Sequence, residues 1–256
     1  MIDLQTGRMS TQPLSRIVII GAILAIAGAA TMVAASIGSR LAWWPFSTGF
    51  TLLRYGTIAA LAALPVLCWG AYATRPGNPM RGFGLALLTM TLAFVAAAVP
   101  LSWLYTARTV PPIHDISTDL DNPPAFAAVL PLRGDGSNPV PPRVTGTAAQ
   151  QRDAYPDIRP VLFSGSPEDA FDRALAVARS MGWEIVSADD SAGRIEATDT
   201  TFWFGFKDDI VVRLTAQIDG TRVDVRSTSR VGRSDVGANA KRIRAYLVRL
   251  TDSKPG

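Results

Sequence analysis

Three long apolar runs in the first 106 residues constrain the fold more than any other feature of this chain. The runs are residues 17–37, 55–73 and 83–105. Each has about 20 residues, which as a helix cross roughly 30 Å of hydrocarbon. They predict three transmembrane helices within residues 17–106, preceded by a tail of residues 1–16.

The first run could instead be a secretory signal peptide, with Ala34-Ala35-Ser36 as its cleavage site of small residues. Its length exceeds the usual apolar core of such a peptide, and two further runs follow, so a retained helix is favoured. None of the runs holds an acidic residue or a histidine. This argues against a proton relay or an ion path through them.

Flanking arginines predict the orientation in the membrane, because the cytoplasmic side carries more of them. One side would hold Arg8, Arg16, Arg75 and Arg81, and the other Arg40, Arg54 and Arg108. We therefore expect the N-terminus inside and the large C-terminal part outside the cytoplasmic membrane.

The net charge of +4 belongs to the apolar part, because residues 107–256 hold 19 basic and 20 acidic residues. A nucleic-acid binder would carry excess positive charge on its soluble part, so no nucleic acid is expected as partner. The single cysteine, Cys68, excludes a disulfide within the chain and a cysteine metal cluster. We expect no metal and no cofactor.

Residues 107–160 contain ten prolines, which predict an extended segment without long helices. The prolines are Pro111, Pro112, Pro123, Pro124, Pro131, Pro139, Pro141, Pro142, Pro156 and Pro160. The only histidine, His114, stands beside Asp115 and could be half of an acid–base pair. No candidate nucleophile is near, so a structural role is favoured.

Residues 161–256 show the pattern of a folded α+β domain. Ser166 and Pro167 resemble a helix start, and Gly182 a helix end. Strand-like runs follow at residues 183–188, 194–200, 210–218 and 221–231, and a second helical pattern spans about 234–250. The order predicts an antiparallel sheet of about four strands with helices on one face.

An Asp219-Gly220 pair between two of these runs predicts a hairpin turn. A two-residue turn there would place Arg213 directly opposite Arg226, where like charges repel. Asp224 and Asp209 would be their diagonal neighbours, so a surface ion-pair ladder is the favoured interpretation. Alternatively, these arginines could hold an external anion or a partner protein, since with Arg230 three arginines meet two acids on this face.

Residues 229–244 run from a strand through a turn into the last helix. Arg230 and Arg233 stand close to the helix start, which could attract an anion. Ser234 and Asp235 explain the same stretch as a cap with an acidic first turn, and we favour that structural role.

Four aromatic residues precede two acids in residues 202–209. Phe202, Trp203, Phe204 and Phe206 could line a pocket for an apolar or sugar-like ligand, or pack in the core. Asp208 and Asp209 could be hydrolytic carboxylates. Adjacent residues of a strand point to opposite faces, which disfavours that pairing.

Several ordered blocks resemble the family called domain of unknown function 1499 (DUF1499). They are PPIHDISTD at 111–119, NPPAF at 122–126, GRIEA at 193–197, FGFKDD at 204–209, VRS at 225–227, RVG at 230–232, SD at 234–235, GANA at 237–240 and RIR at 242–244. The resemblance covers about residues 111–250 and implies a bacterial envelope protein, but no activity. It also implies that the proline-rich segment packs onto the domain.

Three functions remain open at this point. The favoured one is a three-helix anchor carrying a periplasmic domain that binds an envelope lipid, a glycan or a membrane protein without catalysis. The second is a membrane-tethered hydrolase of an envelope polymer, using Asp208 or Asp209 with His114. The third is a structural subunit that docks on a membrane complex through the arginine-rich face. Composition does not indicate an oligomeric state.

Overall fold

The structure is a computed structural model that describes residues 12–140 and 146–252. It contains two compact units, Met1–Leu104 and Tyr105–Gly256. Arg8, Pro141 and Pro142, which entered the predictions of orientation and of extended backbone, lie outside the described residues.

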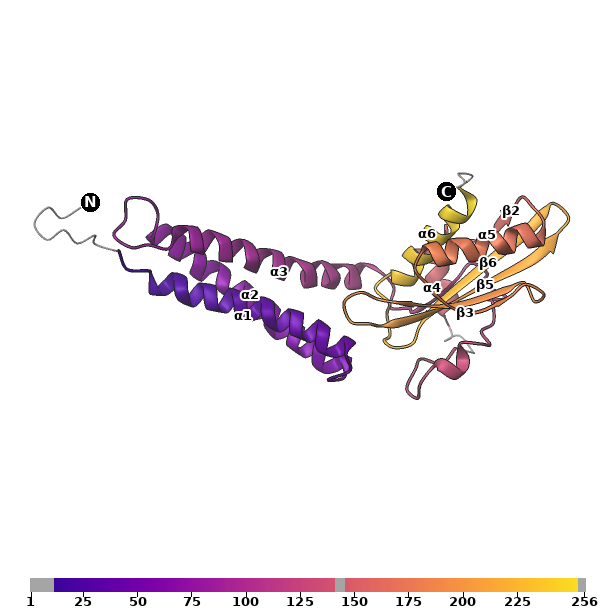
Figure 1. The fold of residues 1–256 in the computed structure, drawn as a ribbon, viewed down its shortest axis with the longest axis horizontal. Coiled ribbons are helices and arrows are strands. Elements are labelled where there is room, and N and C mark those ends of the chain that lie inside the picture. Colours follow the sequence, from indigo (N-terminus) through magenta and orange to yellow (C-terminus); the bar gives the residue numbers. More distant parts are fainter. Residues whose placement is uncertain (1–11, 141–145, 253–256) are drawn as a thin grey trace, which may run out of the picture. The chain divides into compact units, whose positions relative to one another are not determined.

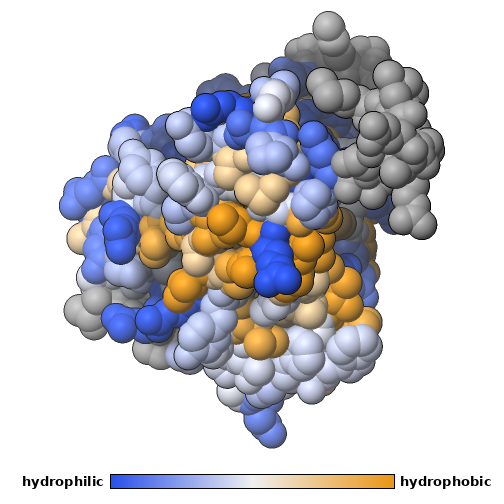
Figure 2. Space-filling view, turned by 90° about the vertical axis from the view of Figure 1, so that its left-hand side faces the viewer, coloured by the Kyte–Doolittle hydropathy of each residue, from blue (hydrophilic) through white to orange (hydrophobic). Residues whose placement is uncertain are grey.

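The first unit is built from three apolar helices: α1 (Arg16–Arg40), α2 (Phe46–Ala73) and α3 (Phe83–Thr109). All three are long and apolar enough to cross a membrane, which confirms the three predicted spans. The second begins at Phe46 rather than Tyr55, because Pro45 supplies the helix start and no residue interrupts the helix in between. Apolar residues remain exposed, for example Ile23 and Leu88, and orange apolar atoms lie at the surface in Figure 2.

Helices α1 and α2 approach each other through glycine. A Cβ atom at Gly28 would lie 2.8 Å from the carbonyl oxygen of Gly56, closer than such atoms come in real structures. Small residues at this contact allow the two backbones to touch, as is common between membrane helices.

The second unit is an antiparallel sheet with helices on one face (Figure 1). Its strands are β1 (Asp115–Ser117), β2 (Val161–Phe163), β3 (Glu184–Asp189), β4 (Arg194–Thr200), β5 (Lys207–Gln217) and β6 (Gly220–Ser229). The order is β1-β6-β5-β4-β3, and β2 also pairs with β6. The fold class is as predicted, but six strands replace about four. The two additional strands have only three residues each, too few to show an alternating pattern.

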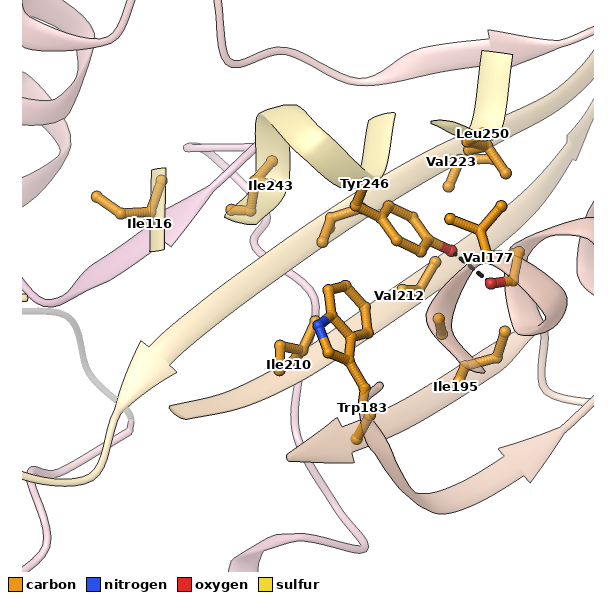
Figure 3. Packing of buried hydrophobic residues seen from close by; sticks show 14 of the residues in the cluster. Ile116, Val177, Trp183, Ile195, Ile210, Val212, Val223, Ile243, Tyr246 and Leu250 are labelled. Carbon is orange, nitrogen blue, oxygen red and sulfur yellow. Dashed lines mark hydrogen bonds between the residues drawn. The ribbon is translucent and has the colours of Figure 1, made fainter. Parts of the chain in front are cut away.

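One face of the sheet carries the hydrophobic core. Helices α5 (Pro167–Ser180) and α6 (Ala238–Thr251) cover it, and the short helix α4 (Thr147–Ala154) precedes β2. Trp183 stacks on Tyr246 with ring centroids 5.0 Å apart, and the Tyr246 hydroxyl donates a hydrogen bond to the Ala174 carbonyl (Figure 3). Ser166 caps α5 as predicted, accepting a hydrogen bond from the Asp169 N–H.

The predicted register of the β5–β6 hairpin is wrong by two residues. Gln217 pairs with Gly220, so the turn residues are Ile218 and Asp219. Gly220 has φ +141°, and a Cβ there would overlap the Phe163 carbonyl oxygen, so glycine at this position lets β2 approach β6. A shift of two keeps each side chain on its predicted face. It places Arg213 opposite Asp224 instead of Arg226.

The last helix begins at Ala238, four residues after the predicted start at Ser234. Val236 has φ +54°, which breaks the helical path, and Gly237 follows with φ +79°. The Asp235 carboxylate accepts hydrogen bonds from the N–H groups of Gly237 and Asn239, so it supports the first turn from outside the helix.

The second face of the sheet is covered by part of the proline-rich segment, residues 118–140, which we call the cover segment. It includes the 3-10 turn η1 (Leu130–Leu132). Phe126, Val129 and Val140 of this segment pack with Val211 of β5. Polar side chains of the sheet beneath this segment, such as Asp209 and Arg226, are therefore buried.

Candidate functional site

Arginines of β5 and β6 meet carboxylates beneath the cover segment, and we call this group the arginine network. Arg226 lies at its centre, with 5% of its side chain exposed. Its guanidinium donates to both carboxylate oxygens of Asp115, at 2.9 and 2.8 Å. It also donates to the carbonyls of Pro124 and Val140. An external anion would have to displace these internal acceptors.

Asp209 forms the second centre of the network. Its side chain is fully buried. It accepts hydrogen bonds from Arg133 of the cover segment and from Arg230, the residue that follows β6. The Thr198 hydroxyl donates to the same carboxylate, and Arg230 also donates to the Leu132 carbonyl. Both Asp209 oxygens therefore already accept hydrogen bonds from within the domain.

Asp119 and Asp224 form the third centre, at the edge of the cover segment. Arg213 and Arg222 each donate to both carboxylates, at distances of 2.9 to 3.2 Å. Asp224 is buried, whereas the Arg222 side chain is 34% exposed. This centre is therefore the part of the network that reaches the surface.

The surroundings of Asp119 lower its pKa. Partial burial alone would raise this pKa, but hydrogen bonds from the N–H groups of Asn122 and Asp121 outweigh that effect. The charges of Arg222 and Arg213 lower the pKa further. The ionised carboxylate is therefore the form that stabilises the fold.

This shift predicts how acid acts on the domain. A lowered folded-state pKa gives stability that is present above the unfolded value, about 4, and is lost as pH falls through the folded value. We expect Asp119→Asn to be less stable than the wild type at pH 7, and the difference to shrink toward zero below about pH 4. Thermal unfolding of both proteins across this pH range measures it. A difference that is independent of pH would contradict the ionic role of Asp119.

Asp208 and Asp209 point to opposite faces of β5. Asp208 lies on the helix side, where the Arg242 guanidinium of α6 donates to it at 2.6 Å and to Asp199 at 2.8 Å. The backbone carbonyl of His114 accepts a hydrogen bond from the Ser229 N–H. The Nδ1 atom of its ring lies 3.4 Å from the Arg233 carbonyl oxygen. The structure therefore gives the two carboxylates separate arginine partners.

The four aromatic residues of the β4–β5 loop divide into two pairs. Phe204 is buried and stacks on Phe206, with centroids 5.5 Å apart. Phe202 and Trp203 are 79% and 47% exposed. Their rings contact each other edge to face, with centroids 5.3 Å apart.

A cleft of about 400 Å³ lies beside the exposed part of the network. Its lining includes Asp119, Asp121, Arg152, Arg159 and Arg222. Arg152 and Arg159 are exposed, and within residues 12–140 and 146–252 no ion pair is found for either. In the same described part, no group of three His, Cys, Asp or Glu side chains could hold a metal ion.

Sequence reasoning found most arginines of the network but missed several partners. Asp115 was interpreted only with His114, Asp119 stood only in a block of the family resemblance, and Arg133 was given no partner. The partners lie far away in the chain: Arg226 and Asp115 are separated by 111 positions. The only sequence signal for Asp115 and Asp119 was the family resemblance, whose first block contains both.

The fold and this network define a class: a membrane-anchored α+β domain whose polar sheet face is closed by its own proline-rich segment. Residues 115–250 match the family described as "Protein of unknown function (DUF1499)". The match spans more than half of the chain, so the chain belongs to the DUF1499 family, which confirms the resemblance. A comparison with curated proteins finds no match.

Proposed function

We propose that this chain is a membrane-anchored binding protein of the bacterial inner membrane, with its C-terminal domain in the periplasm. The domain binds an anionic group, a phosphate or carboxylate of an envelope lipid or glycan, and catalyses no reaction. The observation that carries this proposal is the cleft beside Arg222, where Arg152 and Arg159 add two exposed guanidinium groups.

The charge of the cleft supports an anionic ligand. Arg222 and Asp119 are paired with each other, and the remaining charged lining is Arg152 and Arg159 against Asp121. Guanidinium groups bind phosphates and carboxylates through paired hydrogen bonds. Arg222 is held in place by Asp224, so part of the site is organised before a ligand arrives.

The two alternatives receive less support. A hydrolase needs a carboxylate whose oxygens can reach a substrate, whereas Asp209 is buried between two arginines and Asp208 is bound by Arg242. Docking through Arg213, Arg226 and Arg230 needs accessible guanidinium groups, whereas Arg226 lies beneath the cover segment.

The test is native mass spectrometry of the full chain, purified in mild detergent from its own membrane. We expect a bound lipid or glycan mass that is lost from the Arg152→Ala, Arg159→Ala double variant. The matched control is Arg179→Ala, Lys241→Ala, which removes the same charge from exposed positions of α5 and α6. Loss of the mass from both variants, no bound mass in the wild type, or a bound protein instead would each overturn the proposal.

A further inference from the structure

Two arginines at one end of the apolar helices have no acidic residue of their own unit to pair with. Arg75 and Arg81 stand in the connection between α2 and α3, and both are exposed. Residues 12–104, the described part of this unit, contain no aspartate and no glutamate. The negative charge that balances these two guanidinium groups must therefore come from outside these residues.

Both arginines line one cleft, which has a volume of about 390 Å³. Its lining also includes Gln12, Thr74 and Phe83, which stand before α1, directly after α2 and at the start of α3. The start of α1 and the α2–α3 connection lie at the same end of the helices (Figure 1). Apolar helices that cross a bilayer end at the level of the lipid headgroups, so the cleft lies at the depth of the lipid phosphates.

The backbone around the cleft is fixed by internal hydrogen bonds. The Asn78 side-chain amide donates to the Ala73 carbonyl at 2.9 Å, which closes the C-terminal end of α2. The Arg81 N–H donates to the Pro13 carbonyl, and the Ser15 N–H donates to the Arg81 carbonyl, both at 3.0 Å. The chain before α1 therefore holds the α2–α3 connection in place. A site with a fixed backbone loses less conformational entropy when a ligand binds.

An aromatic stack on α2 positions the first of these arginines. The guanidinium carbon of Arg75 lies 4.1 Å from the ring centroid of Tyr72, and this ring stacks on Trp69 with centroids 5.6 Å apart. The ring contacts the flat face of the guanidinium group, whereas the N–H groups point outward in its plane. Those N–H groups have the geometry that binds two oxygens of a phosphate.

The cleft adjoins apolar surface, which favours a lipid over a free phosphate ion. Met80 lines the cleft and is 38% exposed. Leu85 lines a second hollow that shares Arg81 with the first, and Leu88 follows one turn later on α3 with 69% of its surface exposed. A molecule with a phosphate and hydrocarbon chains matches both the charge and the apolar surface.

We propose that Arg75 and Arg81 form a binding site for the phosphate group of an anionic phospholipid. The two guanidinium groups bind the phosphate oxygens in the cleft, and the acyl chains lie against the exposed apolar side chains of α3. This site belongs to the first unit alone. It is separate from the cleft of the C-terminal domain and does not rest on the function proposed for that domain.

The test is a titration of the full chain with phosphatidylglycerol in mild detergent, followed by native mass spectrometry. The Arg152→Ala, Arg159→Ala background removes the charge of the other cleft from the measurement. We expect Arg75→Gln, Arg81→Gln to raise the apparent Kd of the first bound lipid roughly 30-fold. The matched control is Arg16→Gln, Arg54→Gln, which removes the same charge from exposed positions of α1 and α2 outside the cleft. It should change the Kd less than about threefold.

A second variant separates guanidinium geometry from charge. Arg75→Lys, Arg81→Lys keeps the charge that orients the helices in the membrane but lacks the planar fork, so we expect an intermediate Kd. Diacylglycerol, which has the chains without the phosphate, should bind equally to the wild type and to the glutamine variant. Equal weakening by the control variant, or no lipid bound to the wild-type site, would overturn the proposal. Displacement of the lipid by glycerol 3-phosphate at the same concentration would overturn the lipid as the source of the phosphate.

Discussion

Replacing Arg226 by methionine should destabilise the C-terminal domain by about 3–5 kcal/mol, the usual cost of breaking a buried ion pair by removing one partner. Asp115 would keep its place beneath the cover segment but lose two charge-assisted hydrogen bonds from Arg226. The carbonyls of Pro124 and Val140 would lose a donor as well. Methionine retains the apolar packing of the side chain, so the loss reports the guanidinium itself.

Arg244→Met is the matched control. Arg244 also forms a two-bond pair with an aspartate, Asp157, but their side chains are 42% and 54% exposed. Exposed pairs contribute about 0–1 kcal/mol, so this variant should unfold close to the wild type. Calorimetry of the full chain in detergent should show a fall of roughly 10 °C in the domain's unfolding temperature for Arg226→Met. Equal small shifts for both variants would mean that the arginine network does not hold the domain together.

Features of this fold that depend on local sequence could be predicted, whereas long-range pairing could not. The three apolar runs and the helix start at Ser166 could be predicted because composition and capping are local properties. The hairpin was found but its register was not, because an Asp-Gly pair allows a turn at 218–219 as well as at 219–220. A shift of two residues preserves the apolar face, so the hydrophobic pattern could not reveal the error.

The cover segment was the largest element that local patterns missed. Its prolines and its short 3-10 turn show neither the helical nor the strand period, so composition alone describes a linker. Its order comes from single contacts made far along the chain, such as Arg133 to Asp209 and Asn138 to the Ser229 carbonyl. Those contacts also determine which groups a ligand could reach. They engage arginine and aspartate side chains that the sequence predicted as ligands of an anion or a substrate.

Replacing Glu196 by alanine should release the middle of the cover segment. The Glu196 side chain is fully buried on β4, and its two oxygens accept hydrogen bonds from the N–H groups of Ala127 and Val129, at 2.9 to 3.0 Å. Without the carboxylate the N–H of the buried Val129 loses its acceptor, which costs about 1–3 kcal/mol, and the N–H of the exposed Ala127 loses its anchor to the sheet. The segment can avoid this cost by opening locally to water.

Hydrogen–deuterium exchange measures that opening directly. A loss of about 3 kcal/mol in local stability corresponds to roughly 100-fold faster exchange at Ala127 and Val129. Glu196→Gln, which keeps one oxygen acceptor, should give an intermediate rate. Glu184→Ala on the neighbouring strand, where the side chain is exposed, should leave both amides protected. Unchanged exchange in Glu196→Ala would mean that apolar packing of Phe126 and Val129 alone holds the segment. Faster exchange confined to this stretch would show that one buried carboxylate turns a proline-rich connection into part of the folded domain.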